Sequence, residues 1–269
     1  MARATAFQSE EAAGAHTEFK GLTTLLRAWR LAAGLQQRRG KALSQKEVAE
    51  RAGVSERWYR SLESGSAVSL PPDVLDKLAE ALDLGPDERL ALYSHALSGS
   101  TFTRPTPVVD RGTVAALRQL VNDTLRVPAY LTDYAWNIIG YNAQMAAWFP
   151  WVREPSANLL RWALTSPGGR ANLLDWREEI GHYLAQLRFS LVTWPEDPAL
   201  NELLAHILQV PECREVWYRQ SQVVAYRQGH RFRLSLPAVS PRELVVTAQV
   251  LLPAFHADVR LVMLLPCEE

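Results

Sequence analysis

The chain has 269 residues, of which 48% are hydrophobic and 22% charged, a composition typical of globular proteins with room for two domains. No apolar run reaches the roughly 18 residues of a membrane span, and residues 1–17 lack the apolar stretch of a signal peptide. Two isolated cysteines, Cys213 and Cys267, do not make a disulfide framework or a metal-binding motif. We therefore expect a cytoplasmic protein with reduced thiols, no metal and no membrane contact.

The formal net charge is zero, but basic residues are concentrated near the N-terminus. Between Glu18 and Gly65, five glutamates stand against ten basic residues, namely Lys20, Arg27, Arg30, Arg38, Arg39, Lys41, Lys46, Arg51, Arg57 and Arg60. A locally basic surface of this kind favours a partner that carries phosphates.

Five helices are predicted before residue 98. The first spans Glu18–Gly34, where apolar residues recur at helical spacing and Gly34 supplies a stop. The second begins at Ser44, an N-cap followed three residues later by Glu47, and runs to Ala52. Three more follow, at Ser55–Gly65, from Ser69–Pro72 to Leu82, and at Pro86–Leu97. Together they predict an all-helical domain at residues 18–98, preceded by a disordered tail at 1–17.

A stretch rich in Pro, Ser and Thr at 99–112 is a predicted linker to a second domain at 113–269. Helical patterns occupy residues 114–125, 142–149, 159–164, 176–189, 198–208 and 211–219, and Gly168-Gly169 is expected to form a turn. Alternating patterns predict strands at 130–133, 137–141, 223–226, 232–236, 244–253 and 259–265. The expected fold class is α+β, with an all-α five-helix domain followed by a domain that contains an antiparallel sheet.

The segment Leu43–Ser55 has the features of a helix-turn-helix. In that motif the second helix enters the major groove of DNA while the first crosses the phosphate backbone. Gly53 permits the positive φ angle that the tight turn needs. The two helices are expected to be sealed together by Val48, Ala49, Val54, Tyr59 and Leu62. The pattern indicates a protein that binds double-stranded operator DNA.

Candidate DNA contacts lie on the solvent side of both helices. Gln45 and Lys46, at the start of the first helix, are expected to contact phosphates, which the helix dipole also favours. The outward face of the second helix comprises Ser55, Glu56, Arg57, Trp58, Arg60 and Ser61. Arg57 or Arg60 is suited to a bidentate contact with guanine, and Trp58 to a thymine methyl group or to sugars. A solvated surface helix is the alternative interpretation of these residues.

These residues carry a family resemblance. Leu43–Gly65, followed by Pro71–Leu75 and Leu78–Leu82, resembles the helix-turn-helix of the xenobiotic-response-element (XRE) family of bacterial transcription regulators. The run Gly53–Gly65, with aromatic Trp58 and Tyr59, is similar to the MmyB-like subgroup. The second half is also similar, at Pro128–Tyr130, Trp136-Asn137, Asn142, Asn158–Arg161, Asp175-Trp176, Leu187-Arg188, Asp197–Leu200 and Glu215–Trp217. The resemblance covers residues 18–98 and 113–269.

In that family the second half is a PAS-like sensor for a small apolar ligand, with fatty acids as the leading class. The resemblance therefore implies a regulator that is controlled by ligand binding, without a catalytic role or a resident cofactor. One departure is Gln220–Gln222, where the family pattern has a histidine and an acidic or polar partner. If this position touches the ligand, the departure puts the ligand's identity in doubt.

Seven of the nine tryptophans lie after residue 130, which favours an apolar pocket between a sheet and its covering helices. The candidate ligand contacts are aromatic side chains together with one arginine suited to a carboxylate, namely Trp148, Phe149, Trp162, Tyr183, Arg188, Phe189 and Trp217. An ordinary aromatic core and an ion-paired arginine are the alternative interpretation.

Two other interpretations of the second half stay open. In one it is only a dimerisation module, and in the other it is an enzyme tethered to DNA. The enzyme is the weaker alternative because the six histidines are scattered and no phosphate loop or nucleophile elbow is present in the sequence. A homodimer is expected because helix-turn-helix proteins read paired half-sites.

Overall fold

The computed structural model describes residues 21–37, 40–66, 68–98, 111–123, 125–227, 229–253 and 258–267. The tail expected at 1–17 and all but the end of the linker expected at 99–112 lie outside these residues. The chain forms two compact units. One contains the described residues up to Gly85 with Trp217–Ser221, and the other contains Pro86–Val216 with the described residues from Gln222 onward.

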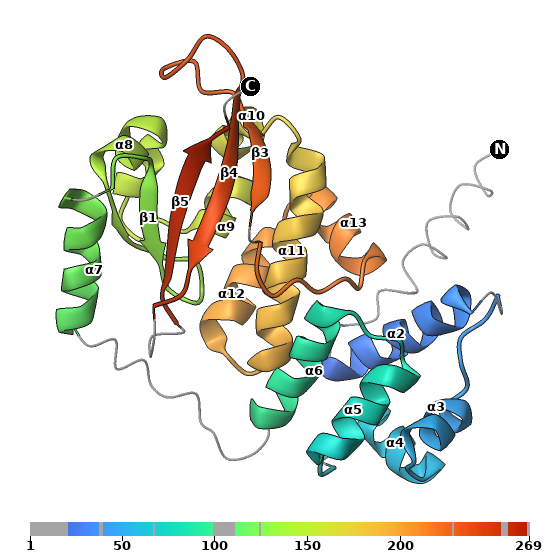
Figure 1. Cartoon of the computed structure of the whole chain (residues 1–269). Coiled ribbons are helices and arrows are strands. Elements are labelled where there is room, and N and C mark those ends of the chain that lie inside the picture. The colour runs from blue at the N-terminus through green and yellow to red at the C-terminus, as the bar shows by residue number, and fades with distance from the viewer. Residues whose placement is uncertain are drawn as a thin grey trace, which may run out of the picture. The chain divides into compact units, whose positions relative to one another are not determined.

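The described helices of the first unit are α2 (Leu22–Gln36), α3 (Gln45–Ala52), α4 (Glu56–Ser64) and α5 (Pro72–Ala81) (Figure 1). The later helices are α6 (Pro86–Ser98), α7 (Arg111–Asp123), α8 (Ala143–Trp148), η1 (Pro150–Arg153, a 3-10 helix), α9 (Leu159–Thr165), α10 (Pro167–Asn172), α11 (Trp176–Thr193), α12 (Pro198–Ile207) and α13 (Pro211–Arg219). The strands are β1 (Ala129–Thr132), β2 (Ile138–Tyr141), β3 (His230–Leu234), β4 (Leu244–Leu251) and β5 (Arg260–Pro266). Within the described ranges, no helix has the length and apolar character that crossing a membrane requires.

Helix α2 contributes a long apolar face to the core of the first unit. Its buried side chains recur at helical spacing and include Leu22, Leu25, Leu26, Trp29 and Ala33. The prediction that Gly34 ends this helix is wrong, because α2 continues to Gln36. A Cβ at Gly34 would lie 2.0 Å from the carbonyl oxygen of Lys41, so the glycine permits close packing rather than termination.

Helices α3 and α4 begin and end where their capping residues predict. Ser44 Oγ accepts from the Glu47 amide at 3.1 Å, and the Ser44 amide donates to Glu47 Oε2 at 2.8 Å, which completes the capping box. Gly53 ends α3 with a φ of 69°, and Ser55 then caps α4 by accepting from the Trp58 amide. These caps fix the short connection and therefore the direction in which α4 leaves α3.

The second unit is built on a five-stranded antiparallel sheet with the strand order β2-β1-β5-β4-β3. The outer strand β2 pairs with β1, placing Tyr130 opposite Tyr141. The connection from β2 to β3 contains helices α8 to α13. This arrangement confirms the α+β class expected from the sequence, whereas the PAS-like classification stays a prediction.

The two faces of the sheet contact different parts of the second unit, because successive side chains of a strand point to opposite sides. On one face, Ala129, Leu131 and Leu261 pack with Val121 of α7 in a buried cluster. On the other face, Tyr130 lines the same pockets as Leu159 of α9 and Tyr183 of α11. This second face is where the sheet has space beside it.

The prediction of a strand at 223–226 is wrong. The segment pairs with no described strand, because its backbone amides form hydrogen bonds with residues of helices instead. The Val224 amide donates to the carbonyl oxygen of Ala185 in α11 at 3.2 Å, and the Ala225 amide donates to Asp87 Oδ1 in α6 at 3.2 Å. We refer to residues 222–227 as the pinned segment.

The pair Gly168-Gly169, expected as a turn, instead lies inside helix α10. Ser166 caps this helix by accepting from the Gly169 amide at 2.9 Å, and Pro167 occupies its first turn. A Cβ at Gly169 would lie 2.3 Å from the Trp162 carbonyl oxygen. The close approach of α9 therefore requires the glycine, and no turn is involved.

Helix α6 groups with the second unit, although we expected it to complete the N-terminal domain. It packs against α11, and His95 Nδ1 lies 2.9 Å from the Val192 carbonyl oxygen. Helix α11 itself continues to Thr193, four residues beyond its predicted end at Phe189. The extra turn is the part of α11 that meets His95.

Candidate DNA-reading face and ligand pockets

The contact between α3 and α4 is tight and apolar. Val48, Ala49, Tyr59 and Leu62 are buried as predicted, and Val54 is half-buried. Since Val48 and Ala49 lie on α3 and Tyr59 and Leu62 on α4, the opposite side of α4 is left to face solvent.

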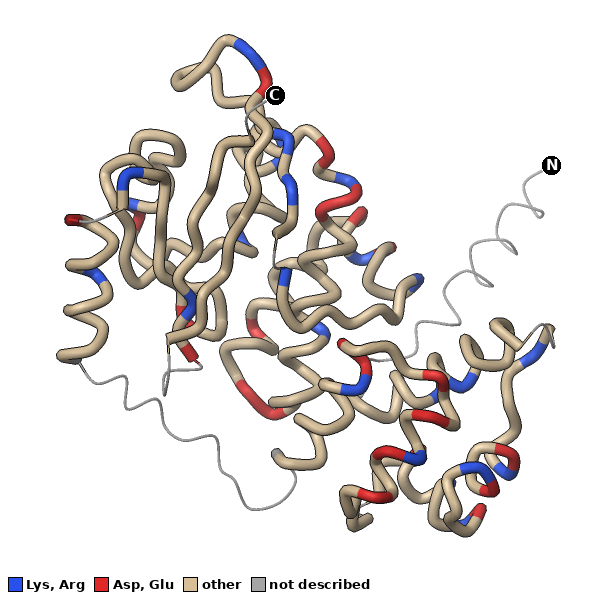
Figure 2. Tube along the Cα trace, viewed as in Figure 1, with Lys and Arg blue, Asp and Glu red and all other residues tan. Residues whose placement is uncertain are grey.

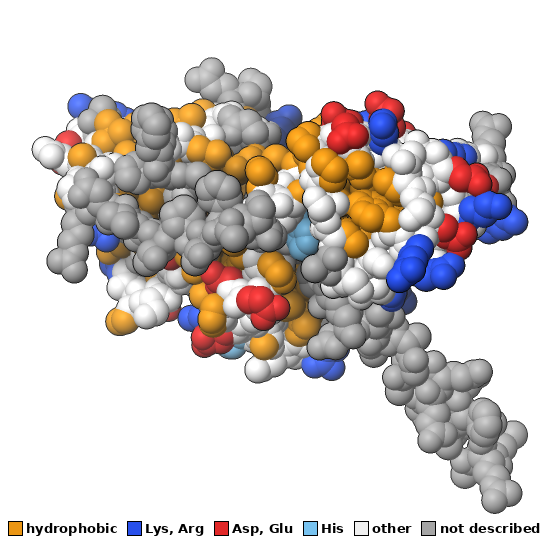
Figure 3. Space-filling view, turned by 90° about the horizontal axis from the view of Figure 1, so that it is seen from below, with side chains coloured by type: hydrophobic (Ala, Val, Ile, Leu, Met, Phe, Trp, Pro, Cys, Tyr) orange, Lys and Arg blue, Asp and Glu red, His pale blue; other side chains and the backbone are white. Residues whose placement is uncertain are grey.

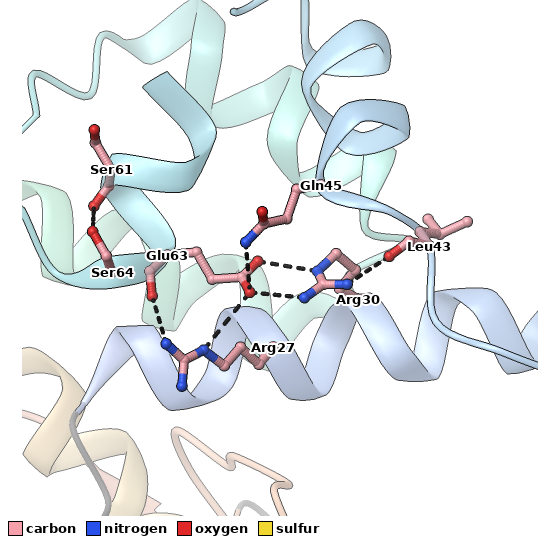
Figure 4. A network of polar contacts seen from close by, with 7 residues as sticks. All are labelled: Arg27, Arg30, Leu43, Gln45, Ser61, Glu63 and Ser64. Carbon is pink, nitrogen blue, oxygen red and sulfur yellow. Dashed lines mark hydrogen bonds and ion pairs between the residues drawn. The ribbon is translucent and has the colours of Figure 1, made fainter. Parts of the chain in front are cut away.

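A buried carboxylate joins α4 to α2 and α3 (Figure 4). Glu63 accepts from Arg30 Nε at 3.0 Å and Nη2 at 2.8 Å, and from Gln45 Nε2 at 3.3 Å. Arg30 also donates to the Leu43 carbonyl oxygen at 2.7 Å, and Arg27 Nε lies 3.7 Å from Glu63 Oε1. The hydrogen bond to Glu63 raises the pKa of Arg30. This paired geometry fixes the orientation of α4 against α2.

The predicted base-reading face of α4 is accessible. Its exposed members are Ser55, Arg57 and Arg60, and its half-buried members are Glu56, Trp58 and Ser61. Arg60 Nη2 lies 2.6 Å from Glu56 Oε1, one helical turn away. Arg57 forms no hydrogen bond or ion pair with the other described residues. Of the two arginines, Arg57 is therefore the one whose guanidinium is available without first breaking a pair.

The two predicted phosphate contacts on α3 differ in their surroundings. Lys46 is exposed, and its ammonium group lies 3.8 Å from Glu50 Oε1 in a solvated pair. Gln45 is half-buried, and its amide donates to Glu63. A phosphate bound at Gln45 would share this amide with the Glu63 carboxylate, whereas Lys46 is open to solvent.

Basic and acidic residues are interspersed along α3 and α4 (Figure 2). The space-filling view shows the same mixture at the side of the molecule that carries these helices (Figure 3). Exposed Lys46, Arg57 and Arg60 contribute positive charge, and exposed Glu50 contributes negative charge. Because Glu63 is buried, the surface of this motif is more basic than its sequence total.

Two adjoining pockets lie on the α9 and α11 side of the sheet, and Tyr130, Leu159, Tyr183 and Phe232 form walls of both. The first, which we call the arginine pocket, is further lined by Thr132, Trp136, Gln186, Tyr226, Arg227, Ala248, Val250, Arg260 and Val262. The second, the tryptophan pocket, is further lined by Met145, Phe149, Trp151, Trp162, Leu173, Leu234, Val246 and Leu264. Their cavity volumes are about 50 and 40 Å³.

Three predicted ligand residues, Phe149, Trp162 and Tyr183, line the tryptophan pocket. The rings of Phe149 and Trp162 meet edge to face with centroids 5.4 Å apart. Trp151, which the sequence analysis does not single out, stacks on Trp162 at 4.7 Å. These ring contacts make the aromatic wall continuous on this side.

The other four predicted ligand residues line neither pocket. Trp148 and Phe189 are half-buried, and Trp217 is buried. Arg188, expected to hold a carboxylate, is 2% exposed and donates through Nη1 to the Gln222 carbonyl oxygen at 2.7 Å. Burial lowers the pKa of Arg188 to about 10. In this structure Arg188 anchors the pinned segment to α11.

A buried charged cluster that the sequence does not predict lies beside the arginine pocket. Glu179 of α11 accepts from Arg227 Nη2 at 2.6 Å, and its other oxygen lies 2.8 Å from His230 Nε2. The Arg227 guanidinium also lies 4.8 and 4.9 Å from the ring centroids of Tyr183 and Phe232. Burial acts to raise the pKa of Glu179, but the hydrogen bonds to His230 and Arg227 lower it overall.

No local sequence pattern predicts this cluster. Glu179 lies 48 residues from Arg227 and 51 from His230, so only the fold brings the three together. Arg227 directly follows the segment predicted as a strand, and this is the one sequence signal that places it near the sheet.

Comparisons with known families match two separate regions of the chain. Residues 22–92 match a family described as a helix-turn-helix domain. Residues 114–269, more than half of the chain, match the family described as the MmyB-like transcription regulator ligand binding domain. The chain belongs to the MmyB-like transcription regulators. No individual curated protein gives a significant match.

Membership of the MmyB-like family confirms the resemblance found in the sequence. The protein is a DNA-binding transcription regulator with a ligand-binding domain. Helices α3 and α4 lie inside the helix-turn-helix match, and both pockets lie inside the ligand-binding match. Both families are regulatory, which fits a protein without a catalytic role. Within the described ranges, no three His, Cys, Asp or Glu side chains are grouped to hold a metal ion.

Proposed function

We propose that a small apolar ligand of the fatty-acid type binds in the second unit and sets the affinity of this regulator for its operator. The observation that carries the proposal is the apolar space against the sheet, bounded by Met145, Phe149, Trp162, Leu173 and Leu264, in a domain of a ligand-binding family. Small-molecule sites are typically apolar spaces with a few convergent polar groups. An aliphatic chain suits walls that offer few hydrogen-bond partners.

In this proposal α4 enters the major groove, and α3 crosses the phosphate backbone. Arg57 supports this assignment because its guanidinium is exposed and engages no other described residue. Arg60 reads a second base after exchanging its pair with Glu56, and Lys46 contacts a phosphate. Trp58 is half-buried and supplies an apolar contact to a thymine methyl group or to sugars.

Helices α11 and α6 supply a route from ligand to DNA. Helix α11 contributes Tyr183 to both pockets and packs against α6, and Asp87 of α6 holds the pinned segment at Ala225. Helix α6 follows directly after Gly85, where the first unit ends. A ligand that favours one position of α11 therefore acts on the helix that follows the DNA-binding unit in the chain. The effect requires different ligand affinities in two states of the protein.

Native mass spectrometry of freshly purified protein, followed by denaturing extraction, tests the ligand class. We expect a co-purifying fatty acid or a similar apolar molecule. The proposal fails if the protein is empty and calorimetry detects no binding of fatty acids from octanoate to palmitate. That result would favour the alternative in which the second unit is only a dimerisation module.

We further propose that the regulator acts in the cytoplasm as a homodimer, because paired recognition helices read half-sites about one helical turn apart. Sedimentation of the protein alone and bound to operator DNA tests the dimer. We expect the mass of two chains in at least the DNA complex. A single chain in both samples would contradict it.

A further inference from the structure

The second unit contains a third cavity, which we call the outer cleft. It is lined by residues of η1, α9, α10 and α12 and of the connection between η1 and α9, and none of its lining residues belongs to a strand. Its volume is about 510 Å³, whereas the arginine and tryptophan pockets have volumes of about 50 and 40 Å³. Small-molecule sites usually measure about 300–1,000 Å³, so of these three cavities the outer cleft is the one that already has this size.

The outer cleft carries one acidic and one basic side chain that are not paired with each other. Glu154 is exposed, Arg161 is half-buried, and both line the cleft. The Glu154 carboxylate and the Arg161 guanidinium form no hydrogen bond or ion pair with the other described residues. A guanidinium with free donors is well suited to a carboxylate, and a free carboxylate is suited to a cation. One ligand with both kinds of charge therefore matches the two side chains at once.

Two tryptophans supply the aromatic wall of the outer cleft. The rings of Trp151 and Trp162 stack with their centroids 4.7 Å apart and an interplanar angle of 12°, and both side chains are half-buried. The face of a tryptophan ring attracts cations more strongly than that of any other aromatic side chain. The wall therefore favours an ammonium group, and the Glu154 carboxylate adds attraction of the same sign.

The rim that carries Glu154 is fixed to the sheet by backbone hydrogen bonds. The Ala157 amide donates to the Glu154 carbonyl oxygen at 3.2 Å, and the Ile138 amide of β2 donates to the Ala157 carbonyl oxygen at 2.8 Å. Between them, Ser156 lines the cleft with a φ of 57°, a value that residues other than glycine adopt rarely. Residues in this backbone region cluster at ligand clamps and other functional sites. The rim is thus positioned before a ligand binds.

We propose that the outer cleft binds a zwitterionic small molecule, which carries an ammonium group and a carboxylate. The ammonium group contacts the Trp151 and Trp162 rings and lies close to Glu154, and the carboxylate accepts from Arg161. His206 of α12 also lines the cleft and offers a further hydrogen-bonding ring. This site is additional to the apolar-ligand site of the proposed function and does not depend on it.

Three probes of nearly equal shape separate the two charges. Glycine betaine carries both charges, 3,3-dimethylbutyrate has carbon in place of the quaternary nitrogen, and choline has a hydroxymethyl group in place of the carboxylate. Saturation-transfer NMR of the full-length protein at fixed salt measures the affinity for each probe. We expect glycine betaine to bind about tenfold more tightly than either of the others. Equal affinities for the three probes, or no binding of glycine betaine at millimolar concentration, would overturn the proposal.

Substitution of Arg161 tests the carboxylate contact. Arg161→Met should abolish the preference for glycine betaine over choline, because the two probes differ only in the group that Arg161 recognises. Arg153→Met is the matched control, since Arg153 is an exposed arginine of η1 that does not line the cleft. This control should keep the wild-type preference.

Substitution of Glu154 tests the ammonium contact. Glu154→Gln should reduce the preference for glycine betaine over 3,3-dimethylbutyrate, and Glu202→Gln, at an exposed position of α12 outside the cleft, should leave it unchanged. Thermal unfolding checks that each variant is folded. Wild-type preferences in folded Arg161→Met and folded Glu154→Gln would overturn the proposal.

Discussion

A single carboxylate, that of Glu63, bonds to Arg30 of α2 and to Gln45 at the start of α3 while lying on α4 itself. Removing one partner of a fully buried pair costs about 3–5 kcal/mol, because the other charge stays buried without compensation. The Arg30 side chain keeps 18% of its surface exposed, so solvent offsets part of this cost. Glu63 therefore contributes to recognition indirectly, by orienting α4.

We predict that Glu63→Gln lowers the opening free energy of α4 by about 2–3 kcal/mol, a value reduced for the exposure of Arg30. Amide hydrogen exchange over the peptides of α4 measures this quantity. Glu56→Gln is the matched control on the same helix, because its pair with Arg60 is solvent-exposed and contributes about 0.5 kcal/mol or less. Equal losses in both variants would contradict the role assigned to Glu63.

Substitutions at Arg57 and Lys46 should distinguish base contacts from phosphate contacts. Arg57→Ala should weaken operator binding about tenfold to one-hundredfold, the value of a bidentate guanine contact, and leave binding to random DNA nearly unchanged. Lys46→Ala should weaken both and reduce the salt dependence by about one phosphate contact. Fluorescence anisotropy with a selected operator and a scrambled duplex measures the difference. Similar losses on both duplexes for both variants would mean that the base-reading face is elsewhere.

Contacts between residues close in the sequence can be predicted from it, and contacts between residues far apart in the sequence cannot. The capping box of Ser44 and Glu47 spans three residues, so the sequence alone predicts it. The pairs of Glu63 with Arg30 and of Glu179 with Arg227 join residues 33 and 48 apart. For the same reason the sequence predicts Arg188 as the partner of a carboxylate, although the fold places other arginines, Arg227 and Arg260, at a pocket.

At the scale of elements, the predicted types are mostly confirmed, and the errors have physical causes. Alternation at 223–226 predicts a half-buried, extended chain. It does not predict whether the backbone amides of this chain form hydrogen bonds with a neighbouring strand or with helices. Gly34 and Gly169 resemble a helix stop and a turn, whereas the structure uses their missing Cβ atoms for close contacts. A glycine in a sequence thus indicates that the backbone position is constrained, but it does not tell whether the cause is a turn or a close contact.

We predict that Gly169→Ala destabilises the second unit by about 1–3 kcal/mol, because the new methyl group meets the rigid backbone of α9. Gly168→Ala is the matched control. Its Cβ would lie 3.2 Å from the end of the Trp162 side chain, and alanine's higher helix propensity offsets the contact, so we expect a change below about 1 kcal/mol. Urea unfolding followed by tryptophan fluorescence compares the two variants. A larger loss for Gly168→Ala would contradict the packing of α9 and α10.

At the scale of the whole molecule, two compact units perform two tasks, and the sequence identifies both tasks through family resemblance. Helix α6, expected in the DNA-binding domain, packs on α11, which lines both pockets. The same helix is tied at Asp87 to the pinned segment that carries Arg227. Ligand binding and DNA binding are therefore expected to influence each other through α6.

The central claim is that a ligand in the second unit alters operator affinity, and operator titration with and without saturating dodecanoate tests it most directly. Fluorescence anisotropy of delipidated protein at fixed salt should show an operator Kd that differs about fivefold or more between the two conditions. By linkage, saturating operator DNA should change the dodecanoate Kd by the same factor. An unchanged operator Kd, with calorimetry showing dodecanoate bound, would contradict the account.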